Sequence, residues 1–361
     1  MKISTYILAA ALLFSACNTE NISQALTQKK ANGATLHFTA AKVELHTEAG
    51  DESVIVATLA KTDSVFYLNN YSSFSSKQTL YGIVYDEPWL QVRTADGKEG
   101  WVYGGMVKMD KKTDSDDLKL LLQRRCATFF GQVLADKIAT HNEILKTAKT
   151  QEQFAAFYAT AMLLRDALTQ KIADQVSKSE QIPDLFWLEA CIKGFVPQLS
   201  EDGKSYHLYT DYNVFSDKAA RTTGEADEQF FRILLLLYPE DGIEYSQKSY
   251  SILYDDAATT PASLLGEGKH LQLLTAADAA LRRSAIFQKE ILSLKKEIVD
   301  DIMLNTKYWQ VQDKIIQEID DILATRLGTI LTDNDKNALR IRRVQFINSD
   351  KNHLQLNMRE G

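Results

Sequence analysis

Residues 89–103 carry the pattern that decides the first part of the fold: WLQVRT at 89–94, ADGK at 95–98 and GWVY at 100–103. Apolar and polar residues alternate in the first run, and alternation puts successive side chains on opposite faces of a strand. An Asp-Gly pair between two such runs is a strong local signal of a hairpin turn. We therefore predict two antiparallel strands joined by a tight turn.

Shorter runs rich in β-branched and aromatic residues precede this hairpin, at 54–59, 65–68 and 81–85. Such residues are typical of strands. Strands this short and this evenly spaced predict a small antiparallel barrel over residues 34–110. The serine-rich stretch 69–79 interrupts the pattern, and we predict a long polar loop there, where such barrels often carry binding loops.

The order WLQVRT, DGK and GWV, followed by a closing GGMV at 104–107, resembles the bacterial SH3-like domain. The resemblance covers about a fifth of the chain. It implies a binding module, often for cell-wall peptides or other envelope partners. The aromatic residues that we would test for binding are Tyr67, Tyr71, Phe74, Tyr85 and Tyr103. Aromatic rings offer stacking faces with a polar edge. We expect Trp89 and Trp101 in the core, whereas for Tyr71 and Phe74 packing and binding stay equally open.

The amino terminus has the layout of a secretory signal, with Lys2, an apolar run at 7–14 and two small residues before Cys17. The run is too short to span a bilayer, which takes about 20 residues. The stretch FSAC at 14–17 resembles the lipobox of bacterial lipoproteins, although Phe14 stands where leucine is usual. The resemblance implies that residues 1–16 are removed and that Cys17 carries the lipid, palmitate among its acyl chains. The alternative is a plain signal peptide that ends at a chance cysteine.

The residues after Cys17 are polar and show no apolar period, so we predict a tether over 17–33. The lipid would hold the folded part at a membrane of the cell envelope. Only Asn18-Thr19-Glu20 follows Cys17, and not an acidic pair. Because a short acidic signal is typical of surface export, we expect a position facing the periplasm.

Residues 114–361 indicate a mainly α-helical domain, and we recognise no family in them. Thr150 and Gln153 fit a capping box. One apolar face of a long helix follows, with side chains at spacings of three and four: Phe154, Phe157, Tyr158, Ala161, Leu164, Leu168, Ile172 and Val176. In the last third we predict an antiparallel pair of helices, from Thr275 to about 305 and from about 307 to 331. Residues 339–347 fit either a closing strand or a last helix.

Two irregular stretches interrupt this domain, at 200–224 and 245–268. Long insertions of this kind are usually functional or disordered, and the aromatic residues of the first argue against disorder. We predict a second interaction surface there, around Tyr206, Tyr209 and Tyr212.

The sequence offers little chemistry beyond binding. The formal net charge is −7, which gives no attraction to nucleic acid. None of the six histidines has a partner at metal-ligand spacing, and we expect neither metal nor cofactor. Cys126 and Cys191 fit small buried hydrophobes, and their pairing stays open. The acidic pair at 300–301 fits a solvated helix face, whereas the pair at 255–256 lies in a predicted loop.

The sequence thus predicts a multidomain protein, a small all-β SH3-like barrel followed by a mainly α-helical domain. We expect a non-enzymatic envelope lipoprotein that binds a membrane through its anchor and peptidoglycan or an envelope protein through its domains. A cell-wall hydrolase with its active site in the irregular loops is the alternative. A third hypothesis is a structural subunit of a surface assembly.

Overall fold

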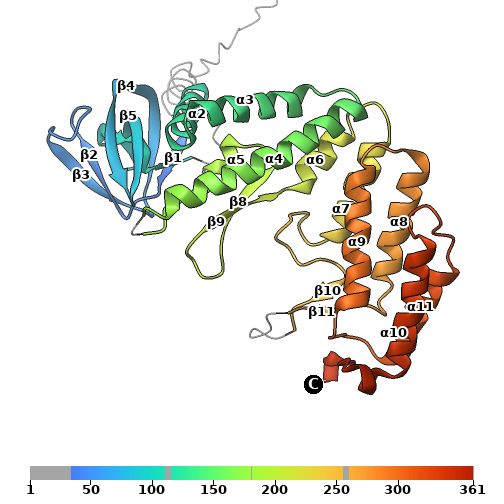
Figure 1. Ribbon diagram of the computed structural model, residues 1–361. Coiled ribbons are helices and arrows are strands. Elements are labelled where there is room, and N and C mark those ends of the chain that lie inside the picture. The colour runs from blue at the N-terminus through green and yellow to red at the C-terminus, as the bar shows by residue number, and fades with distance from the viewer. Residues whose placement is uncertain (1–33, 110–114, 180, 255–259, 361) are drawn as a thin grey trace, which may run out of the picture. The chain divides into compact units, whose positions relative to one another are not determined.

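The computed structural model describes residues 34–109, 115–179, 181–254 and 260–360 (Figure 1). The predicted signal, Cys17, the tether and the acidic pair at 255–256 lie outside these residues. The described chain divides into two compact units. The first consists of residues 34–78, 86–108 and 115–121, and the second of residues 79–85, 109 and 122–360. The protein is therefore multidomain, as predicted.

A curled antiparallel sheet makes up the first unit, with strand order β3-β2-β6-β5-β4-β1-β7. Inward-facing apolar side chains such as Val43, Leu45 and Leu90 are fully buried against it. The strands are β1 Thr35–Phe38, β2 Lys42–His46, β3 Ile55–Ala60, β4 Ser64–Leu80, β5 Ile83–Thr94, β6 Glu99–Tyr103 and β7 Val107–Lys108, with the 3₁₀ turn η1 Gly104–Met106 before β7.

The predicted hairpin is confirmed. β5 and β6 pair antiparallel, with Trp89 opposite Tyr103 and Arg93 opposite Glu99. At the turn, the Thr94 amide donates to the Lys98 carbonyl at 2.9 Å, and Gly97 has a φ of +85°, which glycine adopts without the steric cost of a Cβ. Trp89 lies in the core, as expected, but Trp101 is only half-buried.

The loop predicted at 69–79 is wrong, because β4 continues as a strand from Ser64 to Leu80. Its serines bond to other strands: the Trp89 amide donates to Ser72 Oγ at 2.9 Å, and the Trp89 indole donates to Ser76 Oγ at 3.0 Å. The Tyr103 hydroxyl donates to the Ser76 carbonyl at 2.8 Å. Serine therefore supplies cross-strand hydrogen bonds here, and local composition does not reveal them.

The second unit is mainly helical, as predicted. All eight residues of the predicted apolar face on α4 are buried, and Thr150 accepts the N-cap bond from the Gln153 amide at 3.3 Å. The Gln153 side chain accepts from the Lys149 amide instead of from Thr150, so only half of the predicted capping box forms. The α-helices are α2 Asp116–Phe130, which begins in the first unit, α3 Gln132–Thr147, α4 Gln151–Val176, α5 Leu188–Cys191, α6 Tyr212–Ala219, α7 Ala226–Leu237, α8 Lys269–Arg283, α9 Gln288–Leu304, α10 Gln312–Ala324 and α11 Asp333–Ile347.

Two segments differ from the prediction, and a third decides an alternative that the sequence left open. Residues 200–224 are ordered, with β9 Tyr206–Thr210 pairing with β8 Phe195–Leu199 before α6 begins. Thr275 lies inside α8, which begins after Gly268, because Gly268 adopts a left-handed φ of +77° that ends the preceding loop. The open segment at 339–347 is helix α11, whose N-terminus Thr332 and Asp335 close with a capping box. The short strands β10 Ser251–Ile252 and β11 Ala262–Ser263 also pair in this unit.

An aromatic core holds α4, α6, α7 and β8 together. Phe215 on α6 is its centre, with Phe157 and Phe154 of α4, Phe195 of β8 and Phe231 of α7 at ring-centroid distances of 5.8–6.3 Å. Buried aromatic side chains contribute large apolar areas and oriented ring contacts. This core fixes the elements that carry the surface features described below. In the described part of the chain, no helix is both long and apolar enough to cross a membrane.

Candidate functional site

Three of the predicted barrel aromatics belong to the interior. Tyr67, Tyr85 and Tyr103 are all less than a tenth exposed. The Tyr67 hydroxyl donates to the Asp117 carboxylate at 3.5 Å, and burial raises the Tyr67 pKa well above its usual value. No ring face of these three is open to a partner, so they are core residues and not a surface.

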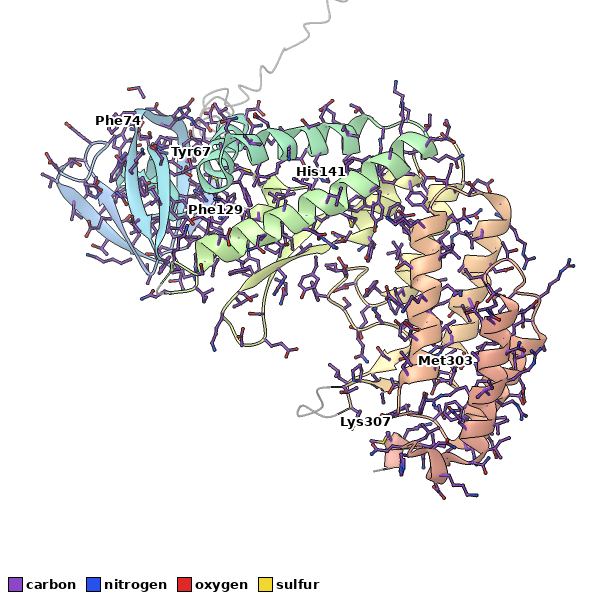
Figure 2. The ribbon with its side chains drawn as sticks, in the orientation of Figure 1. Tyr67, Phe74, Phe129, His141, Met303 and Lys307 are labelled. Atoms are coloured by element: carbon purple, nitrogen blue, oxygen red, sulfur yellow. The ribbon has the colours of Figure 1, made fainter. Side chains whose placement is uncertain are left out.

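Of the five barrel aromatics predicted to bind, Tyr71 and Phe74 on β4 are the two that are not buried. Tyr71 is half-buried, and Phe74 is 50% exposed (Figure 2). They point outward from a paired strand, where a side chain is held more firmly than on a loop. Their exposure fits the binding interpretation, which stays a prediction.

The β8–β9 hairpin and the start of α6 determine which of the three tyrosines predicted in the second unit are exposed. Strand β9 alternates, so that Tyr206, Leu208 and Thr210 point inward while His207 and Tyr209 point outward. Tyr206 donates to the Pro183 carbonyl at 3.0 Å. Tyr212, on the first turn of α6, stacks on Tyr238 at 5.4 Å. Tyr209 is therefore the only one of the three that is open to a partner.

Tyr209 does not stand alone. Its ring lies 5.7 Å from that of Tyr245 in an edge-to-face arrangement and 6.2 Å from the ring of His207. We call these three residues the β9 platform. Tyr245 comes from a later segment, which the bridge between Asp211 and Ile243 joins to the hairpin. The sequence placed Tyr209 in a binding surface, but it contained no signal that joins Tyr245 to it.

Acidic groups lie beside the platform. The pKa of the Tyr245 phenol is raised, first by burial and then by the neighbouring Asp241 carboxylate, to which Tyr245 donates a hydrogen bond. Asp241 also accepts from Ser246, which helps to lower its pKa. At 42% exposed, Tyr245 keeps a ring face open. The β9 platform therefore combines apolar ring faces with hydrogen-bond acceptors at their edge.

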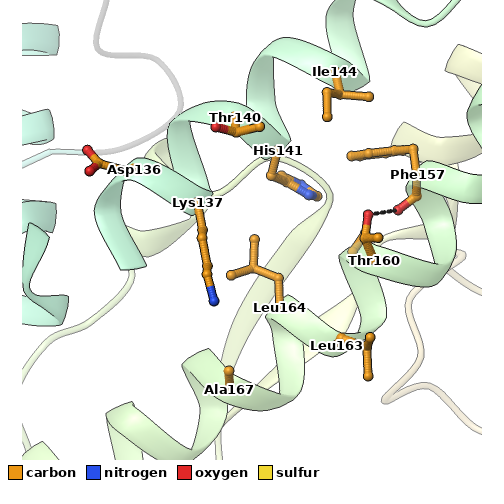
Figure 3. Close-up of a pocket in the computed structure, with 11 residues that line it drawn as sticks. Asp136, Lys137, Thr140, His141, Ile144, Phe157, Thr160, Leu163, Leu164 and Ala167 are labelled. Atoms are coloured by element: carbon orange, nitrogen blue, oxygen red, sulfur yellow. Dashed lines mark hydrogen bonds between the residues drawn. The ribbon is translucent and has the colours of Figure 1, made fainter. Parts of the chain in front are cut away.

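A pocket of about 530 Å³ lies between α3 and α4, away from the predicted site residues (Figure 3). This volume is within the range of small-molecule sites. Aliphatic and aromatic side chains form most of its wall, and Asp136 and Lys137 lie at one end. A second hollow of about 480 Å³ shares Ile144, Phe157 and Thr160 with it, so the seam between the helices is hollowed beyond the pocket itself. Figure 3 shows His141 and Leu164 turned toward each other across the seam.

His141 is the buried polar group in this wall. Its Nε2 lies 2.8 Å from the Lys193 carbonyl, and a carbonyl only accepts, so Nε2 carries the proton. Nδ1 is then an acceptor, and it has no partner among the described residues. Burial lowers the pKa of the imidazole, which keeps the ring neutral at pH 7. Its apolar neighbours are Phe157 and Phe195, with ring centroids at 5.0 and 5.3 Å.

The two cysteines and the Asp301 carboxylate are enclosed. Cys126 and Cys191 are buried, as expected, and they are not joined to each other. A hydrogen bond to the Cys126 thiol, together with burial, raises the Cys191 pKa well above its usual value. Asp301 does not lie on a solvated face: it accepts from Ser263 Oγ at 2.5 Å and lies 2.8 Å from His270 Nε2. Ser263 donates to the carboxylate and not to the imidazole. Through Asp301, α9 is therefore connected to Ser263 of β11 and to His270 of α8. Among the described residues, no three His, Cys, Asp or Glu side chains are grouped to hold a metal ion.

Comparison with known proteins adds no relative. No family model matches the chain, and no curated protein is similar to it in sequence.

Proposed function

We propose that this chain is a lipid-anchored protein of the cell envelope that binds the glycan of the cell wall without acting on it. In this proposal Cys17 carries the lipid, residues 17–33 form the tether, and the folded units face the periplasm. The curled sheet would be an SH3-like binding module, on the strength of the motif at 89–107. The β9 platform would be the principal contact with the wall.

The observation that carries the proposal is the pairing of Tyr209 and Tyr245 at the surface of the second unit. Two large rings that lie edge to face at a surface keep apolar area in contact with water, and a partner that covers them removes that area from water. Acceptors such as Asp241 stand at the edge of these rings. A sugar ring presents apolar C–H faces and hydroxyl donors together, and it matches both features. This combination favours a glycan over an apolar peptide.

Cosedimentation with purified peptidoglycan sacculi tests the proposal. The mature chain should sediment with sacculi, and the double variant Tyr209→Ala, Tyr245→Ala should lose most of that binding. Phe186→Ala is the matched control, because Phe186 is an exposed aromatic outside the β9 platform. Its binding should equal that of the unsubstituted chain. Retained binding in the double variant would refute the role of the platform.

Two further variants separate the alternatives. If Phe74→Ala abolishes sedimentation and the platform variant does not, the first unit is the wall-binding module. Incubation of sacculi with the unsubstituted protein tests the hydrolase alternative: sustained release of soluble fragments would contradict a purely binding role. Labelling with a fatty-acid analogue, with Cys17→Ala as the control, tests the anchor.

A further inference from the structure

We propose that the pocket between α3 and α4 is a second binding site, for a neutral amphiphile whose hydroxyl or amide N–H donates to Nδ1 of His141. This inference does not depend on wall binding, because the pocket and the β9 platform share no residue. The pocket is confined to two helices of the second unit.

The unused acceptor of His141 indicates that the ligand is a hydrogen-bond donor. The ring is 4% exposed, and its Nε2–H is used by the Lys193 carbonyl. A buried acceptor without a donor carries a desolvation cost that no hydrogen bond offsets. The large majority of buried side-chain polar atoms in proteins have a partner. A ligand that donates to Nδ1 would remove that cost, whereas an anion would face the lone pair and gain nothing.

The side chains around His141 indicate that the rest of the ligand is apolar. Ile144 on α3, with Phe157 and Leu164 on α4, surrounds the ring, so the body of the ligand must be apolar. Leu163 lies on the rim and is 71% exposed, an apolar side chain that a bound ligand would cover. The second hollow continues past Ile144, which gives room for an aliphatic tail. A donor-bearing head with an alkyl tail satisfies all three features.

The test uses para-heptylphenol, which has a hydroxyl donor, and its methyl ether, para-heptylanisole, in which a methyl group replaces the hydroxyl hydrogen. Their affinities are measured by calorimetric titration of the mature chain with Cys17→Ser, which removes only the lipid. One hydrogen bond to a neutral acceptor predicts that the phenol binds roughly three- to tenfold tighter than the ether. In His141→Phe, which keeps an aromatic ring between Phe157 and Phe195, the two probes should bind equally.

A surface variant guards against misfolding of the His141 variant. Ala167→Trp fills an exposed part of the wall and should abolish binding of both probes. Ala159→Trp, also exposed on α4 but outside the pocket lining, should bind like the unsubstituted chain. The proposal is overturned if neither probe binds, if the two bind equally to the unsubstituted chain, or if Ala167→Trp binds normally. Sacculus binding should be unchanged in all these variants, which separates this inference from the proposed function.

Discussion

Replacement of Phe215 by alanine is the sharpest test of how the second unit is held together. The side chain is fully buried, and five aromatic rings lie within 6.3 Å of its own, centroid to centroid. Phe→Ala changes in such cores cost about 3–5 kcal/mol, since the cavity that remains adds to the lost transfer energy. That loss is a large share of the 5–15 kcal/mol that is typical of domains. Phe215→Ala should therefore come close to unfolding this unit.

Urea unfolding followed by far-UV circular dichroism measures the effect. With an m-value of about 3 kcal/mol/M, the midpoint should fall by roughly 1 to 1.7 M. Val133→Ala, at a side chain of the same unit that is 72% exposed, should change the free energy of unfolding by less than about 0.5 kcal/mol. A loss below about 1 kcal/mol for Phe215→Ala would show that the ring cluster does not hold α4, α6, α7 and β8 together.

Three other predictions follow from the same packing. Gly194→Ala should destabilise the unit even though the change is small, because Gly194 has a φ of +82° and an added Cβ would lie 2.5 Å from the Phe215 ring; thermal unfolding measures the loss. Oxidation with glutathione disulfide should join Cys126 and Cys191, with two thiols of glutathione released and two hydrogens lost from the protein mass, and Cys191→Ser should block it. The free energy of unfolding should fall as the pH drops from 7 toward 5, because the folded-state pKa of His141 lies below the unfolded value of about 6.5 and the unfolded chain takes up the proton first. His141→Phe should flatten that slope, and an unchanged slope would contradict the assignment.

Local patterns in the sequence predicted the elements that depend on neighbouring residues. The Asp-Gly turn at 96–97 and the apolar face of α4 from Phe154 to Val176 form as predicted, because hairpin turns and helix periodicity are set within a few residues. The serine-rich part of β4 was not predictable in this way. Its strand depends on bonds from Trp89 and Tyr103, which are distant in the chain.

In the candidate sites too, the features set by nearby residues were predictable and those set by distant contacts were not. Tyr209 was predicted as a binding residue, but its neighbours Tyr206 and Tyr212 are buried. Tyr206 lies on the inward face of β9, where side chains alternate, and Tyr212 lies on the first turn of α6, where it stacks on Tyr238. Tyr245 joins Tyr209 only through the bridge at Asp211 and Ile243. His141 carried one usable signal: it falls on the buried face of α3, with Ile138 and Leu145. The pocket beside it arises from the packing of α3 on α4, which the sequence does not reveal.

Nuclear magnetic resonance of the chain labelled with fluorotyrosine tests the central claim most directly, because each tyrosine gives its own signal. Soluble glycan fragments of the cell wall are titrated into residues 17–361 with Cys17→Ser, and the signals are assigned by single Tyr→Phe variants. The account predicts that the signals of Tyr209 and Tyr245 shift together with one affinity, while the buried Tyr67 and Tyr206 stay unchanged. Shifts confined to Tyr71, or no shift at saturating glycan, would contradict it.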